Sequence, residues 1–196
     1  MNWYKIATLA AKRETQIQKL MSGQSFIGYR GAPEAIEKPT APNLGEDVYE
    51  GFYVALLPEY ADVYGPIISQ YKIPPQKVLS SEGRGEALYR EYIKTLMDRN
   101  DPYLWRLSMF TQEEIEKTFS PEERDVNNDA FFFECFGGLA LFLMGPFPEF
   151  LNMAKQEGFT CTFDGSEEVF LLYPDTAEYI GTYEDPLSEY TTRNSI

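Results

Sequence analysis

The chain has 196 residues, enough for one substantial hydrophobic core, and we expect a single domain over residues 1–196. Its formal net charge is −14 and its pI is about 4.4. Because like charges repel, we do not expect it to bind a nucleic-acid backbone or anionic lipid. The sequence contains no histidine, which excludes His-based triads, imidazole general bases and most zinc sites, so we expect no metal. An enzyme with this composition must use carboxylates, Arg, Lys, Tyr or Ser.

The N-terminal residues 1–22 show apolar side chains near helical spacing and predict an amphipathic helix packed on the body of the protein. The residues that form this pattern are Trp3, Ile6, Leu9, Ala10, Ile17 and Leu20. A membrane-surface or partner-docking role is the alternative. The segment does not have the pattern of a signal peptide, so we expect a cytoplasmic protein, one that a phage or an effector system could deliver.

Residues 25–80 predict the first half of a β-sheet. Strands are expected at 25–31, 52–57 and 67–73. Pro58 suits the first position of a short helix and Gly65 suits its end.

Residues 84–157 predict a mainly helical region. The segment 85–98 has an apolar stripe at helical spacing, and Thr111 with Glu114 matches a capping box. The apolar run 130–144 is too short to span a bilayer and is interpreted as a buried helix, so we expect no membrane span.

Residues 158–184 predict the second half of the sheet, with strands at 159–163, 167–173 and 177–183, followed by a tail at 185–196. Helices in the middle and strands towards both ends indicate an α+β fold. Cys135 and Cys161 lie in an apolar run and a predicted strand, and we expect both to be buried free thiols, as in a cytosolic protein.

Two candidate motifs lack the residue or the geometry that their chemistry requires. The segment 125–130 begins like a calcium loop, but Ala130 stands where such loops need glycine. The adjacent acids Glu167 and Glu168 cannot flank one glycosidic bond, because neighbouring residues on a strand point to opposite faces.

Three segments taken in order resemble the ADP-ribosyltransferase family of bacterial toxins and poly(ADP-ribose) polymerases. Tyr29-Arg30-Gly31 matches the family's aromatic-Arg-Gly motif on a first strand. The stretch 51–55 matches Gly-aromatic-Tyr-x-Ala, and 61–64, which ends in Tyr64, matches Ala-x-x-Tyr. Glu168 opens a late apolar strand, the position of the catalytic glutamate. The middle of the chain has no counterpart in these motifs.

The resemblance implies split mixed β-sheets around an NAD cleft, with an N-terminal helix and a helical middle insertion. It implies a mono-ADP-ribosyltransferase that moves ADP-ribose from NAD to a protein or other macromolecular acceptor. In such a site Glu168 would stabilise positive charge on the ribose. Tyr29, Arg30, Gly31, Tyr53 and Tyr64 would bind NAD, with the Arg30 guanidinium on the ribose and pyrophosphate region and the Tyr53 ring on nicotinamide.

Two positions depart from the family pattern. Val54-Ala55-Leu56 stand where the arginine-specific toxins have Ser-Thr-Ser, and Ser166 occupies the acceptor-side position that carries Glu or Gln in those toxins. These departures leave a second hypothesis open, a catalytically inactive binding or virion-associated structural protein on the same fold. A third is an acidic inhibitor that covers a basic partner surface.

Overall fold

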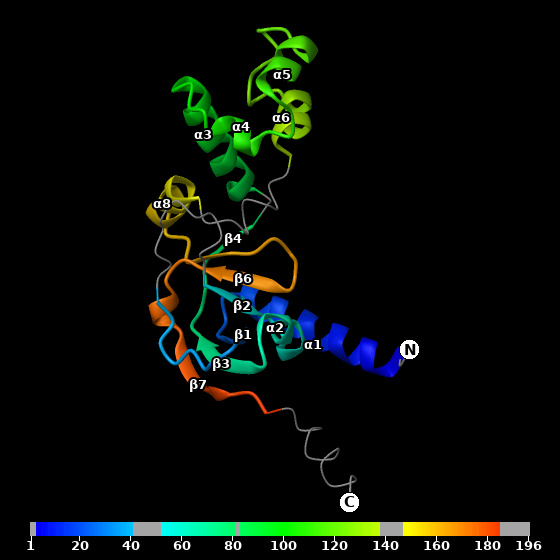
Figure 1. The fold of residues 1–196 in the computed structure, drawn as a ribbon, viewed down its shortest axis with the longest axis vertical. Coiled ribbons are helices and arrows are strands. Elements are labelled where there is room, and N and C mark those ends of the chain that lie inside the picture. The colour runs from blue at the N-terminus through cyan, green and yellow to red at the C-terminus, as the bar shows by residue number, and fades with distance from the viewer. Residues whose placement is uncertain (1–2, 41–51, 81–82, 138–146, 185–196) are drawn as a thin grey trace, which may run out of the picture.

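The computed structural model describes residues 3–40, 52–80, 83–137 and 147–184. It shows an α+β protein in which one mixed sheet lies between an N-terminal helix and a mainly helical region formed by the middle of the chain (Figure 1). The expected class and the order of the helical and strand regions are therefore confirmed.

Seven strands form one hydrogen-bonded sheet in the order β4-β5-β6-β2-β1-β3-β7. They are β1 (Phe26–Ala32), β2 (Tyr53–Ala55), β3 (Ile67–Ile73), β4 (Val78–Leu79), β5 (Cys161–Thr162), β6 (Glu168–Leu171) and β7 (Glu178–Thr182). Among the strands described, β4 and β5 form the one parallel pair.

The expected split into two sheets is not observed. Strand β2 pairs with β1 on one side and with β6 on the other, in the register Tyr29↔Ala55 and Ala55↔Glu168. The C-terminal strands thus extend the sheet formed by the N-terminal strands at both edges, and no break separates the two halves.

The described helices are α1 (Trp3–Met21), α2 (Pro58–Ala61), the 3₁₀ turn η1 (Asp62–Tyr64), α3 (Arg84–Asp98), α4 (Leu104–Leu107), α5 (Gln112–Thr118), α6 (Asp129–Phe136), α8 (Pro148–Gln156) and the 3₁₀ turn η2 (Pro174–Thr176). The helices expected at 1–22, after Pro58, at 85–98 and after Thr111 are all observed, whereas α4 and η2 had no predicted counterpart. Pro58 begins α2, and Thr111 and Glu114 form the capping box of α5. The predicted buried helix at 130–144 is confirmed as far as Phe136, and the rest of it lies outside the described residues.

The two faces of the sheet bury different hydrophobic clusters because successive strand residues point to opposite sides. Val169 and Leu171 of β6 join Phe26 and Leu20 in the cluster on the α1 side. Phe170 lies in the cluster formed with the middle helices. Both cysteines are buried and free, Cys135 in the helical cluster and Cys161 in the α1-side cluster, which confirms that expectation.

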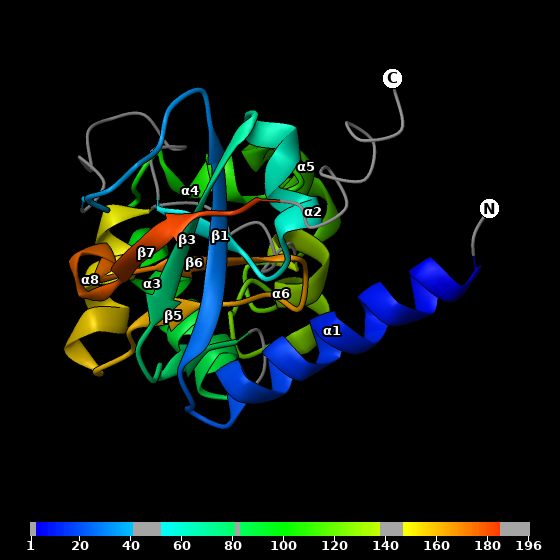
Figure 2. The same cartoon turned by 90° about the horizontal axis from the view of Figure 1, so that it is seen from below.

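Helix α1 packs on the body only through its C-terminal half, contrary to the expectation for its whole length. Leu20 is fully buried, whereas Trp3 is 74% and Ile6 44% exposed. The helix extends past the edge of the sheet, so its first turns have no described element to pack against (Figure 2). None of the helices in the described ranges is long and apolar enough to cross a membrane.

Candidate functional site

The sheet brings the three motif segments side by side. Strand β1 carries Tyr29, Arg30 and Gly31, β2 begins with Tyr53, and β6 begins with Glu168. Because β1 and β6 flank β2, their backbones lie about 10 Å apart, or two strand spacings. Segments more than a hundred residues apart in sequence therefore meet at one place in the fold.

The side chains of Glu168 and Tyr64 lie close together. The Glu168 carboxylate is the largest cause that raises the pKa of the Tyr64 phenol, and burial adds to it. Turn η1 presents Tyr64, whose side chain is still 58% exposed.

Tyr29 lies in the same row of the sheet as Glu168, because both pair with Ala55. Its ring contacts Tyr183 edge-on, with centroids 5.8 Å apart. Burial, with smaller contributions from the negative charges of Tyr183 and Glu59, raises the pKa of the Tyr29 phenol. Glu59 also has a buried Oε2 atom without a hydrogen-bond partner among the described residues, and no sequence motif pointed to this residue.

Arg30 lies on the other face of the sheet, where strand alternation places it one residue away from Tyr29. Its guanidinium stands 4.8 Å from the centroid of the Phe52 ring, and its Nη1 donates a hydrogen bond to the Tyr53 carbonyl at 3.0 Å. Burial lowers the pKa of Arg30, while the charges of Tyr71, Glu168 and other groups oppose that shift. Arg30 is thus within electrostatic reach of Glu168 but does not form an ion pair with it within the described residues.

Tyr53 packs into the core beside the site. Its ring lies 4.9 Å from that of Phe170, its cross-strand neighbour, and it borders the cluster of the middle helices. In this arrangement the ring already has an aromatic neighbour.

Gly31 and Ser166 have local structural roles that the motifs did not indicate. A Cβ atom on Gly31 would lie 2.9 Å from the carbonyl carbon of Ala61, so its lack of a side chain lets α2 approach β1. The Ser166 hydroxyl accepts a hydrogen bond from the backbone N–H of Glu168 at 3.3 Å, which caps the turn before β6. The structure therefore groups Tyr29, Tyr64 and Glu168, with Tyr53 alongside and Arg30 behind them.

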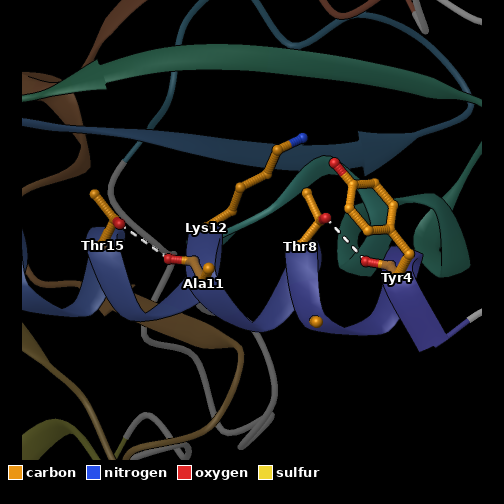
Figure 3. Close-up of a pocket in the computed structure, with 6 residues that line it drawn as sticks. Tyr4, Thr8, Ala11, Lys12 and Thr15 are labelled. Atoms are coloured by element: carbon orange, nitrogen blue, oxygen red, sulfur yellow. Dashed lines mark hydrogen bonds between the residues drawn. The ribbon is translucent and has the colours of Figure 1, made fainter.

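A surface hollow lies elsewhere, along α1 (Figure 3). The described residues that line it are Tyr4, Ala7, Thr8, Ala11, Lys12 and Thr15. The Thr8 and Thr15 hydroxyls donate to the helix carbonyls of Tyr4 and Ala11, both at 2.9 Å. None of the predicted site residues contributes to this hollow. In the described stretches of the chain, no three acidic or cysteine side chains cluster in a way that could hold a metal ion.

Comparisons with known proteins add little to this description. No protein-family model matches the chain, and no curated protein matches it. One solved crystal structure, of an anti-CRISPR protein, is similar at 17% sequence identity and a TM-score of 0.37, over 80% of this chain and 96% of that one. Similarity at this level shows neither a family nor a function.

Proposed function

We propose that the protein is a mono-ADP-ribosyltransferase that transfers ADP-ribose from NAD to a macromolecular acceptor, on a divergent ADP-ribosyltransferase-like fold. The observation that supports it most directly is that β1, β2 and β6 lie side by side, which brings the three motif segments together and places the Tyr64 phenol near the Glu168 carboxylate. Tyr64 and Glu168 both belong to the sequence motifs, and about a hundred residues of chain separate them.

The chemistry of the proposal uses the carboxylate of Glu168. Cleavage of the nicotinamide–ribose bond builds positive charge on the sugar, and a fixed carboxylate stabilises that charge more in the transition state than in the ground state. The Tyr64 phenol would fix the orientation of the carboxylate, and the Tyr29 ring would line the same face. Arg30 would contribute positive potential for the pyrophosphate from behind β2.

The acceptor expected from electrostatics is a protein or other macromolecule with a basic surface. The formal charge of −14 favours encounter with cationic surfaces and disfavours nucleic acid. The Ser166 hydroxyl accepts from the backbone N–H of Glu168 and lacks the carboxylate or amide that the arginine-specific toxins carry at this position, so the proposal does not name arginine as the modified residue.

The test is release of nicotinamide from NAD by the purified protein, compared with its Glu168→Gln and Glu167→Gln variants. We expect Glu168→Gln to reduce the rate by a factor of about 10² to 10³, the usual effect of removing one group that stabilises transition-state charge. Glu167→Gln is the matched control, because it removes the adjacent, exposed carboxylate of the turn that precedes β6. Equal rates in both variants would refute the role of Glu168, and no turnover by the unmodified protein would refute the activity.

A second candidate is a non-catalytic binding protein with the same architecture. The packing of Tyr53 on Phe170 favours this candidate. To stack on nicotinamide, the Tyr53 ring would have to move away from Phe170 or contact both rings at once. The same experiment separates the two candidates. NAD binding without nicotinamide release, unchanged by Glu168→Gln, would support the non-catalytic protein.

A further inference from the structure

Helix α1 makes a specific contact with the turn that leads into β6. Arg13 donates from its Nη2 atom to the backbone carbonyls of Gly165 and Ser166, the second at 2.9 Å. The contact joins residues more than 150 positions apart in the chain. Arg13 is partly buried there, although most of the N-terminal half of α1 is exposed.

The turn held by Arg13 is also bonded internally, and its last bond is to Glu168. The Ser166 N–H donates to the Asp164 side chain at 2.9 Å, and the Ser166 hydroxyl accepts from the Glu168 N–H. Gly165 has φ of 90°, a left-handed conformation that favours glycine. The turn thus directs two consecutive carbonyls towards one guanidinium while its hydroxyl fixes the first residue of β6.

We propose that Arg13 is a positioning residue for Glu168: by holding the 164–167 turn against α1, it sets where β6 begins and where the Glu168 carboxylate stands. This inference rests on the proposed function for its catalytic consequence. A hydrogen bond from a charged guanidinium is about twice as strong as one between neutral groups, and the planar donor group fixes direction as well as distance. Ser166 links Arg13 to Glu168, because its backbone carbonyl accepts from Arg13 and its hydroxyl accepts from the Glu168 N–H.

The test uses Arg13→Ala, Arg13→Lys and the control Lys12→Ala, which removes the neighbouring exposed cation on α1. The first measurement is the alkaline titration of Tyr64 by NMR of ¹³C-labelled tyrosine, with Tyr64→Phe to assign its signal among the 14 tyrosines. We expect the Tyr64 midpoint to move down towards its ordinary value in Arg13→Ala, because the Glu168 carboxylate is displaced from the phenol. Arg13→Lys should give a smaller shift in the same direction and Lys12→Ala none.

The second measurement is the rate of nicotinamide release. We expect kcat of Arg13→Ala to fall about tenfold to a hundredfold with little change in KM for NAD, the result of misplacing a catalytic group. If Arg13→Ala does not fold, Arg13→Lys tests the proposal, and we expect it to give a smaller shift of the Tyr64 titration and a smaller fall in kcat.

An unchanged Tyr64 titration in a folded Arg13→Ala or Arg13→Lys variant would overturn the proposal. Failure of the proposed function would give a different result from failure of this inference. In that case the unmodified protein would release no nicotinamide, while the Tyr64 titration would still respond to Arg13 substitutions.

Discussion

Gly31 of β1 lies directly beneath Ala61 of α2, so close that a Cβ atom on Gly31 would stand 2.9 Å from the Ala61 carbonyl carbon and 3.1 Å from the Gly65 nitrogen. We expect Gly31→Ala to push α2 and η1 away from the sheet and to destabilise the protein by about 1–3 kcal/mol, the usual cost of overpacking. Denaturant unfolding would measure the loss, and the Tyr64 titration would report displacement of η1. An unchanged unfolding midpoint would contradict this packing.

Tyr64→Phe removes the phenol hydroxyl near the Glu168 carboxylate while keeping the ring. Because the pKa of Tyr64 is raised in the folded state, the small stabilisation linked to its neutral form is fully present below the ordinary tyrosine pKa and is lost as pH rises through the raised value. We expect the variant to resemble the unmodified protein in stability, since Tyr64 is largely exposed, but to lower the rate of nicotinamide release about tenfold.

The matched comparison is Tyr60→Phe, which changes a tyrosine on the neighbouring helix α2. An equal loss of rate in both variants would show that the effect does not depend on the Tyr64 hydroxyl near Glu168.

Local sequence signals predicted the elements well but not how they pair. The strand at 67–73, the proline at the start of α2 and the capping box of α5 are each indicated by neighbouring residues in the chain, and each is observed. The continuous sheet depends on β2 pairing with β6 across more than a hundred residues, which no local pattern encodes.

The candidate site was also predicted only in part, because its contacts join residues that are distant in the chain. Adjacent motif strands placed Glu168 near Tyr64. Strand alternation puts Arg30, one residue beyond Tyr29, on the opposite face, where it bonds to the Tyr53 carbonyl and stays within electrostatic reach of Glu168 without an ion pair among the described residues. Arg13 and Glu59 carry no sequence signal, since their roles depend on which distant backbone each one faces.

Helix α1 should contribute to stability through its C-terminal half alone. We expect Leu20→Ala to destabilise the protein by about 2–5 kcal/mol, because Leu20 is fully buried in the α1-side cluster. Ile6→Ala is the matched control on the exposed half and should change stability by less than about 0.5 kcal/mol. Comparable losses from both substitutions in denaturant unfolding would show that the first turns pack on the body after all.

Arg30 should prove to be a stabilising residue of the sheet. Arg30→Met keeps much of the aliphatic stem but removes the cation over Phe52 and the bond to the Tyr53 carbonyl, and we expect a loss of about 1–3 kcal/mol in chemical denaturation. Arg30→Lys keeps the charge without the planar fork and should recover part of that loss. Full stability of Arg30→Met, together with weaker NAD binding, would instead assign Arg30 to the ligand alone.

The two cysteines should resist alkylation for as long as the protein is folded. Burial raises the pKa of Cys161 to about 12, and burial with the nearby Glu134 charge raises that of Cys135 to about 11. Since the thiolate is the reactive form, at pH 8 each thiol should react more than about a hundredfold more slowly than an ordinary exposed cysteine, with Cys161 the slower. Mass spectrometry after timed treatment with iodoacetamide would measure both rates, and guanidinium-unfolded protein would give the exposed reference. Rapid labelling of either site in the folded protein would show that the cluster around that cysteine opens on the timescale of the reaction.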